Sequence, residues 1–158
     1  MRRADREITD VTELIAVIDG CEVCRLALID ENVPYIIPMN YGSEYADGEL
    51  TLYFHGASKG RKIDIIRQNP TGCFEVDRGH RLVKGDAEYS YSMEYESVVG
   101  SGRIEICTSD TDKRHGLACI MKKYVPDKIF NFSQQTIDGV MIFKLNVTEM
   151  TGKRNMLK

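Results

Sequence analysis

The 158-residue sequence contains no tryptophan, few histidines and no long apolar run. A membrane-spanning helix needs about 20 consecutive, mostly apolar residues, so no membrane span is expected. The opening residues MRRADREITD are too polar to lead a secretory signal, and we therefore expect a cytoplasmic protein. The formal net charge of −3 provides no overall basic field, which argues against nucleic-acid binding.

Cysteine is limited to five residues, an odd number, and in a reducing compartment these thiols stay free. Cys21 and Cys24 have the spacing of a motif. However, a structural zinc site would need a second pair, and a thioredoxin-type site would place the pair at a helix start. We interpret these two as incidental and expect no metal site. The other three are interpreted as small apolar core residues: Cys73, Cys107 and Cys119.

The apolar residues that are present follow the periods of helices and strands. Helical spacing, bounded by capping or terminating residues, predicts helices at 10–19, 61–68 and 110–123. Asp10 and Glu13 form the signature of a capping box at the first of these. Alternating apolar residues predict strands at 23–29, 34–41, 49–54, 73–77, 87–106 and 140–150.

The order of these elements predicts a mainly β fold, a small closed antiparallel barrel of six strands decorated by helices. We expect one domain over residues 1–158. A doubly wound parallel sheet is disfavoured because the strands do not alternate regularly with helices. A turn is expected at Arg78-Gly79, and Gly100 and Gly102 indicate a bulge or sharp bend of the kind found in barrel strands.

Three cations crowd the start of the helix at 61–68: Lys59, Arg61 and Lys62. A helix N-terminus carries unpaired N–H groups and the positive end of the helix dipole, so each such cation is unfavourable by about 0.3–1 kcal/mol. An anion bound between them removes this conflict, and a phosphate is the simplest such anion. The preceding small-residue loop lets the backbone approach closely, and Ser58 adds a hydroxyl donor. The alternative is that the cations form a solvated face.

Other kinds of site fit the sequence poorly. The segment from Gly56 to Ile63 is one residue shorter than a P-loop and has isoleucine where the magnesium-binding Ser or Thr belongs, so a nucleoside triphosphatase is not expected. The histidines lack a local nucleophile signature. We interpret His115 as lying on the exposed side of its helix and His80 as part of a turn. No paired acids indicate a hydrolase, and no catalytic residue is assigned.

Five segments have an order and spacing that are fairly specific when taken together: MRR with DRE at 1–7, PYIIPMNY at 34–41, LYFHGA at 52–57 running into GRK at 60–62, YESVVGSG at 95–102, and TGK at 151–153. On these segments the sequence resembles the pyridoxamine 5′-phosphate oxidase-like flavoproteins, the FMN-binding split-barrel family. Within that family it is similar to the nitroimidazole-resistance branch.

The resemblance implies a homodimer of split barrels with one FMN in each of two clefts at the subunit interface. The first strand segment would lay its backbone against the flavin ring. There Pro38 lacks an N–H, so the N–H groups of Met39 and Asn40 would face flavin acceptors. The second segment would hold the phosphate, and a later strand would reach the flavin across the interface. The implied cofactor-binding residues are Pro38, Met39, Asn40, Tyr41, Phe54, His55, Ser58, Lys59, Arg61, Lys62, Tyr95 and Ser97, with Ser92 and Met93 as weaker candidates.

Two alternatives stay open for single residues. His55 fits a surface histidine at a strand end as well as a ligand residue. Pro38 fits an ordinary proline of an edge strand as well as a residue beside the flavin.

Departures from the family pattern limit the chemistry. The oxidases that make pyridoxal 5′-phosphate carry a tryptophan-containing strand followed by a tail with Arg and His. This chain has no tryptophan, and the segment 151–155 has no histidine. We therefore expect an FMN-dependent reductase that passes electrons from a nicotinamide or other donor to a small acceptor such as a nitroimidazole. The alternative is a non-catalytic dimeric module that binds flavin or haem. The turnover of reduced nicotinamide distinguishes the two.

Overall fold

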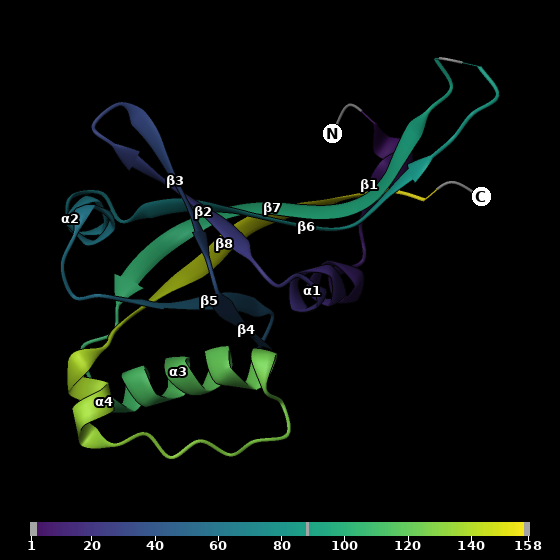
Figure 1. Cartoon of the computed structure of the whole chain (residues 1–158). Coiled ribbons are helices and arrows are strands. Elements are labelled where there is room, and N and C mark those ends of the chain that lie inside the picture. Colours follow the sequence, from purple (N-terminus) through teal and green to yellow (C-terminus); the bar gives the residue numbers. More distant parts are fainter. Residues whose placement is uncertain (1–2, 88, 157–158) are drawn as a thin grey trace.

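The computed structural model describes residues 3–87 and 89–156 (Figure 1). The helical segments are η1 Ala4–Arg6, α1 Val11–Gly20, α2 Arg61–Gln68, α3 Asp110–Tyr124 and α4 Gln134–Gly139. The strands are β1 Glu7–Ile8, β2 Cys24–Asp30, β3 Val33–Met39, β4 Tyr41–Ala46, β5 Glu49–Gly56, β6 Thr71–Val83, β7 Ser92–Ile106 and β8 Met141–Asn155. No helix in these described ranges is both long enough and apolar enough to span a membrane.

The strands form one eight-stranded antiparallel sheet. Its order is β3-β2-β6-β7-β8-β5-β4, and β1 pairs with β8. The two ends of this order, β3 and β4, are separated in the chain by Asn40 alone. The sheet must therefore curl round until its edge strands meet, which is the geometry of a split barrel. The expected mainly β antiparallel barrel is confirmed, with eight strands in place of six.

Alternating side chains of the strands fill the barrel. On β2, Cys24, Leu26 and Leu28 are buried while the residues between them are less buried or exposed. Phe54 of β5 stacks on Phe143 of β8 with ring centroids 5.3 Å apart, and both rings are fully buried. A second, smaller apolar cluster lies where α3 and α4 meet β5 and β8: Tyr53, Cys107, Leu117, Ile120, Ile137 and Ile142.

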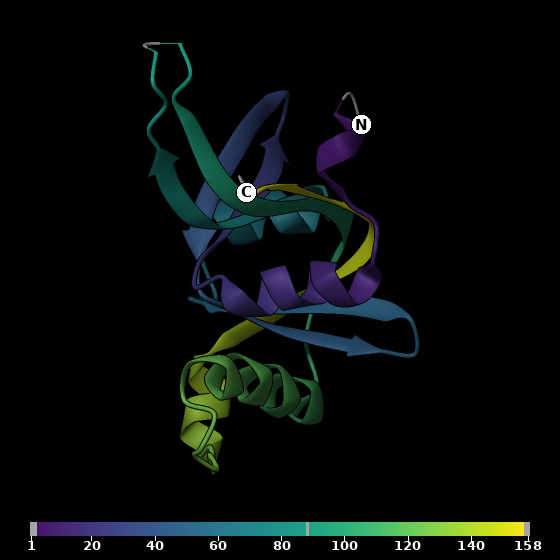
Figure 2. The same cartoon turned by 90° about the vertical axis from the view of Figure 1, so that its right-hand side faces the viewer.

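Three of the α-helices flank the β4–β5 hairpin, whereas α2 packs against β2. Figure 2 shows this hairpin between α1 on one side and α3 with α4 on the other. Two glycines permit the close approach of α3. A Cβ atom added to Gly42 of β4 would lie 2.4 Å from backbone atoms of α3, and one added to Gly116 of α3 would lie 2.7 Å from Ile142. Real Cβ atoms do not come so close, so the packing of α3 depends on these glycines.

The helix predictions at 10–19, 61–68 and 110–123 are confirmed within one or two residues. Asp10 caps α1 by accepting a hydrogen bond from the N–H of Thr12 at 2.7 Å. Glu13, the expected second member of the capping box, instead contacts Arg154 of β8 at 3.1 Å. An ion pair between distant segments has thus taken the side chain that local sequence assigns to the cap.

The strand predictions err mainly in their boundaries. The single strand expected at 34–41 is two strands, β3 and β4, which break at Asn40 and pair with different neighbours. β6 and β8 run well beyond the expected 73–77 and 140–150, whereas β7 begins at Ser92 instead of 87. Sequence reasoning missed β1 and α4. Residues 1, 2 and 88, which belong to expected segments, lie outside the described residues.

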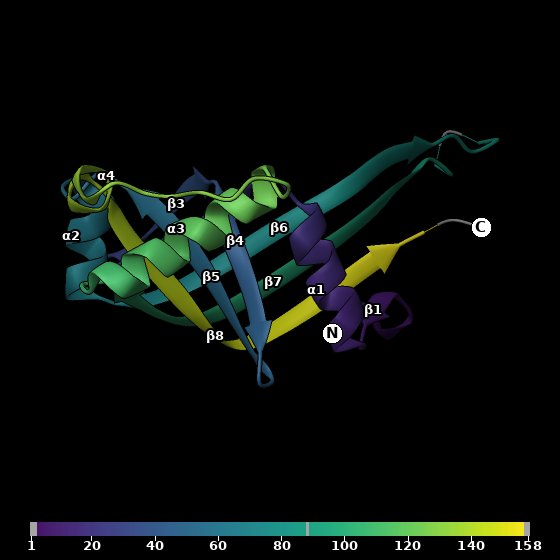
Figure 3. The same cartoon turned by 90° about the horizontal axis from the view of Figure 1, so that it is seen from below.

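The turn expected at Arg78-Gly79 is wrong, because β6 continues through these residues with a register shift between Arg78 and Arg81. This bulge places Gly79 at φ 72° and includes His80. A bulge also occurs beside Gly102, as expected, but the extra residue is Thr148 on the partner strand β8. Beyond the first bulge, the β6–β7 hairpin projects from the body of the protein (Figures 1 and 3).

The cysteines follow the sequence interpretation only in part. Cys107 is buried, as expected, but Cys73 and Cys119 are half-buried. Cys21 and Cys24 lie in the main core, where burial raises the pKa of their thiols to about 11 and about 12. Such thiols are protonated at neutral pH and react slowly.

Candidate functional site

The N-terminus of α2 differs from those of the other three α-helices. Asp10, Ser109 and Ser133 cap α1, α3 and α4 through their side chains. At α2 the N-cap is Gly60, which has φ 118° and no side-chain hydrogen bond. Within the described ranges, the N–H groups of Arg61 and Lys62 have no protein acceptor. The helix therefore presents free donors and the positive end of its dipole to whatever binds there.

Lys62 lies close to these free donors. Its side chain is half-buried and folds back over the end of β5, so that a Cβ atom added to Gly56 would lie 2.9 Å from Lys62 Nζ. Among the described residues its ammonium group forms no hydrogen bond or ion pair. Ser58 and Lys59 are exposed in the loop that precedes the helix. The residues present fit a phosphate group at this position.

Arg61 is more constrained than the sequence suggests. Its guanidinium contacts the carboxylate of Asp30 at 2.7–2.8 Å and lies 4.5 Å from the centroid of the Tyr35 ring. These contacts hold it against the end of the β2–β3 hairpin, although its side chain remains 60% exposed. Arg61 can contact a bound anion only while its guanidinium also remains paired with the Asp30 carboxylate. Its role as a phosphate ligand stays a prediction.

The residues expected beside the flavin ring divide into exposed and buried ones. Pro38 is exposed on the edge strand β3, and Asn40 is exposed between the edge strands. Tyr41 is fully buried, and its hydroxyl donates to carbonyl oxygens at the end of α1, including that of Cys21 at 3.1 Å. Phe54 is equally buried and pairs with Tyr41 across β4 and β5.

The side chains of Tyr41 and Phe54 are therefore structural, and only their backbones could face a ligand. Met39 is almost as deeply buried. Tyr41 and Phe54 form the last pair of β4 and β5, and Asn40 and His55 are the residues next to this pair. His55 is exposed and is the neighbour of Gly56, over which Lys62 folds. The strand break at Asn40 and the start of the α2 loop thus lie toward the same end of the β4–β5 hairpin.

Tyr95 and Ser97 lie elsewhere. Ser97 of β7 pairs with Asp77 of β6. Two residues earlier on β6, Glu75 pairs with Arg25 of β2. Five residues, roughly 17 Å of strand, separate Arg25 from Asp30, where Arg61 is held. A single chain therefore does not bring Tyr95 and Ser97 to the α2 N-terminus.

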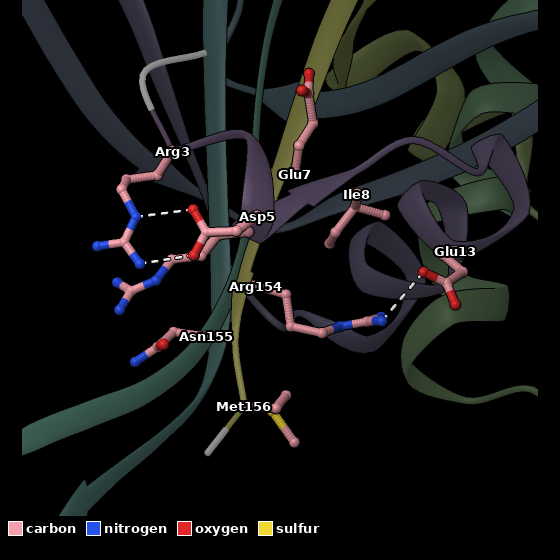
Figure 4. Close-up of a pocket in the computed structure, with 9 residues that line it drawn as sticks. Arg3, Asp5, Glu7, Ile8, Glu13, Arg154, Asn155 and Met156 are labelled. Carbon is pink, nitrogen blue, oxygen red and sulfur yellow. Dashed lines mark hydrogen bonds and ion pairs between the residues drawn. The ribbon is translucent and has the colours of Figure 1, made fainter. Parts of the chain in front are cut away.

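A charged pocket of about 450 Å³ adjoins Tyr95 (Figure 4). Arg3 donates two hydrogen bonds to Asp5, at 2.8 and 2.6 Å, and Arg154 contacts Glu13 on the opposite wall. Tyr95 pairs with Asn155, which lines the pocket. Burial alone would raise the pKa of Tyr95, but hydrogen bonds and charges from Lys153 and Arg6 outweigh it and lower the pKa.

A family model described as pyridoxamine 5′-phosphate oxidase matches residues 10–154. The chain belongs to the pyridoxamine 5′-phosphate oxidase family. It is 34% identical to a candidate 5-nitroimidazole antibiotic resistance protein from Bacteroides thetaiotaomicron, with 94% of this chain and 86% of that chain covered and a TM-score of 0.83. The resemblance inferred from the sequence, including its branch, is confirmed.

Two more distant structures share the fold of this oxidase-family chain. The flavocytochrome Anf3 from Azotobacter vinelandii is 19% identical, with 99% of this chain and 72% of that chain covered and a TM-score of 0.82. The FAD and heme binding protein from Mycobacterium smegmatis is 16% identical, with 96% and 74% covered and a TM-score of 0.83.

Sequence reasoning missed several residues of these two regions. Asp30 and Tyr35, which hold Arg61, come from strands that a linear reading does not connect to α2. Arg154 and Asn155 lie in a strand extension beyond the predicted end at 150. The sequence did contain a signal for the charged pocket. The family-like segments at 1–7 and 151–153 contribute to the pocket or lie next to residues that line it.

Proposed function

We propose that this chain is a flavoprotein that binds FMN, with the phosphate at the N-terminus of α2. The observation that carries the proposal is the uncapped helix start beside the unpaired Lys62 ammonium. Two free backbone N–H groups, the helix dipole and one cation converge there, and a phosphate satisfies all of them. Ser58 and Lys59 supply further donors from the loop, and Arg61 supplies a second cation shared with Asp30.

We further propose that the protein is a homodimer in which the α2 region of one protomer faces the Tyr95 region of its partner. This proposal accounts for the separation of the two groups of family-like residues within one chain. It is also supported by apolar side chains that are exposed on the β3-β2-β6-β7 part of the sheet: Ile29 of β2 is 41%, Ile36 of β3 63% and Val99 of β7 43% exposed. The projecting β6–β7 hairpin adds the exposed side chains of Leu82, Tyr89, Tyr91 and Met93.

The proposed reaction is the transfer of electrons from a reduced nicotinamide or other donor to a small acceptor such as a nitroimidazole. Bound FMN supplies the redox chemistry, and the protein's part is to hold the phosphate, orient the ring and limit access. Support for the acceptor comes from the 34% identical candidate nitroimidazole resistance protein. The lack of tryptophan in the sequence and of histidine in the segment 151–155 favours this reaction over pyridoxamine phosphate oxidation.

The first experiment compares FMN with riboflavin, which lacks the phosphate, by fluorescence titration of the purified protein. Each charge-assisted hydrogen bond contributes about 1.5–3 kcal/mol, so Lys62→Ala should weaken FMN binding by about 10-fold or more and leave riboflavin binding unchanged. Arg67→Ala is the matched control, because it removes an exposed cation from the last turn of the same helix. Equal affinity of wild type and Lys62→Ala for FMN would refute the phosphate assignment.

Turnover separates the proposed reductase from a carrier. Wild-type protein loaded with FMN should oxidise NADH or NADPH when a 5-nitroimidazole is added, as followed by the loss of nicotinamide absorbance. A protein that binds one FMN per chain but oxidises no nicotinamide under these conditions would instead be a non-catalytic flavin-binding module. In that case the phosphate assignment stands and the reductase assignment fails.

A further inference from the structure

Three side chains of kinds that bind metal ions converge between β4 and α3. His115 and Cys119 are four residues apart on α3 and so lie on the same face of the helix, one turn apart. Glu44 of β4 faces them. His115 Nε2 lies 3.0 Å from Glu44 Oε2 and 3.6 Å from Cys119 Sγ, and all three atoms lie within 4.8 Å of one another.

The packing of the backbone fixes this convergence. Gly42 lies two residues before Glu44 on the same face of β4, and it touches the backbone of Cys119 so closely that no side chain fits between them. The spacing between β4 and α3 is therefore set beside the cluster. Tyr53 adds a second constraint, because its hydroxyl donates to Glu44 Oε2 at 3.1 Å and its ring meets the His115 ring edge-on at 5.4 Å.

One hydrogen bond from His115 Nε2 links it strongly to only one of its two neighbours. His115 Nε2 carries either one N–H or one lone pair, so a neutral ring can pair with Glu44 or with Cys119 but not with both. A metal ion accepts electron pairs from all three atoms at once. The ordinary bond lengths of tetrahedral zinc place nitrogen and oxygen ligands about 3.3 Å apart, and nitrogen and sulfur ligands about 3.6 Å apart. The observed separations of 3.0 and 3.6 Å are close to these values.

We propose that Glu44, His115 and Cys119 form a binding site for a zinc-like transition-metal ion, with one coordination position open. Imidazole and thiolate ligands select zinc and its neighbours, whereas calcium and magnesium favour sites built from oxygen ligands alone. The two anionic ligands balance the charge of a divalent ion. Tyr53 is a positioning residue, which orients the carboxylate by its hydrogen bond.

The surroundings leave room for the fourth ligand. A cavity of about 420 Å³ borders Glu44 and Cys119 and extends to Asp19, Ser43, Tyr45, Lys122 and Lys123. The Lys123 ammonium is held by the carbonyl oxygens of Ile18 and Asp19, at 3.0 and 2.9 Å, and so does not pair with Glu44. The cavity thus gives space beside the proposed ion for a water molecule or a small anionic ligand at the open position. The site shares no residue with the proposed flavin-binding regions.

The test uses Co²⁺ and Zn²⁺ with full-length protein that has first been treated with a chelator. Co²⁺ should bind at one ion per chain and produce a thiolate-to-cobalt charge-transfer band in a difference spectrum, and Zn²⁺ should displace it. Cys119→Ser should abolish the band and weaken zinc binding at least tenfold. Cys73→Ser, which changes another half-buried thiol, should leave both unchanged.

Glu44→Gln provides a second variant if Cys119→Ser fails to fold, since it keeps the shape of the side chain and the hydrogen bond from Tyr53. It should retain the charge-transfer band but bind zinc at least tenfold more weakly than wild type. The proposal is overturned if wild-type protein binds no stoichiometric Co²⁺ or Zn²⁺, or if neither variant changes zinc affinity. These readouts do not involve flavin turnover, so they are independent of the proposed reductase function.

Discussion

At the scale of single residues, two glycines allow close contacts that any side chain would block. Gly42 lets β4 touch the backbone of α3, and Gly56 makes room for the Lys62 side chain at the α2 loop. In both places the glycine has no functional role of its own: Gly42 positions Glu44, and Gly56 leaves space for Lys62. A backbone that has to approach another element closely cannot carry a Cβ there.

Gly42→Ala should therefore destabilise the protein. The added Cβ would lie 2.4 Å from backbone atoms of Cys119 and Ile120, which cannot rotate away as a side chain can. We expect a loss of about 3 kcal/mol in the free energy of unfolding, the upper end for overpacking, as measured by urea denaturation. Gly139→Ala is the control, because no atom outside its own helical turn and chain neighbours lies within 4 Å of its Cβ position. Equal stabilities of the two variants would show that α3 can move without loss.

At the scale of elements, β6, β7 and β8 are joined by one carboxylate as well as by their ladders. Glu96 of β7 lies opposite Arg78 of β6 and Arg154 of β8, and it accepts a hydrogen bond from each, at 2.8 and 2.6 Å. Its side chain is 15% exposed. Arg154 also contacts Glu13 of α1, so its guanidinium connects this helix to the strands.

This arrangement predicts a pH dependence of stability. Burial alone would raise the pKa of Glu96, but the hydrogen bonds and charges of Arg78 and Arg154 outweigh it and lower the pKa below its ordinary value of 4.5. The folded protein thus favours the ionised form. The resulting stability is fully present above pH 4.5 and is lost as the pH falls through the lowered pKa of the folded state.

Glu96→Gln should lower the free energy of unfolding by about 1–2 kcal/mol at pH 7 and should flatten its decrease below pH 4.5. Urea denaturation at a series of pH values measures both effects. Glu105→Gln serves as the control, since its 3.4 Å contact with Lys144 is a surface ion pair expected to contribute at most about 0.5 kcal/mol. A Glu96→Gln variant whose stability parallels that of wild type at every pH would contradict this account.

At the scale of the whole molecule, one chain carries the two proposed halves of a flavin site at different ends of its sheet. The exposed apolar residues of β2, β3 and β7 lie between them. A hydrophobic surface of this kind marks an interaction site, and a second copy would bring one half of each site to the other.

Val99→Lys should therefore yield a folded monomer that binds FMN at least tenfold more weakly than wild type. A lysine in the centre of the proposed interface leaves a buried charge without a partner, which opposes association. Sedimentation velocity and circular dichroism report assembly and folding separately. Val125→Lys makes the same change at a residue of similar exposure, 40% against 43%, at the end of α3, and should leave the dimer intact. A wild-type monomer would refute the proposed assembly.

The sequence by itself determined the kinds of the main elements, and it predicts an anion site at the start of α2. Local signals suffice for these: caps and periodicity define α1, α2 and α3, and the glycine-rich loop with its cations defines the start of α2. The mainly β antiparallel fold followed from the order of the elements, and the family from segments spread along the chain.

Only the tertiary structure decided which residues meet. Strand pairing divides 34–41 at Asn40, extends β8 to Asn155 and turns the expected Arg78-Gly79 turn into a bulge. The packing of strands and helices also buries Tyr41 and Phe54, holds Arg61 against Asp30 and brings Glu44 to His115 and Cys119. Each of these contacts joins residues that are distant in sequence. Their energies depend on how the sheet curls and how closely α3 packs, and no local pattern of side chains encodes either.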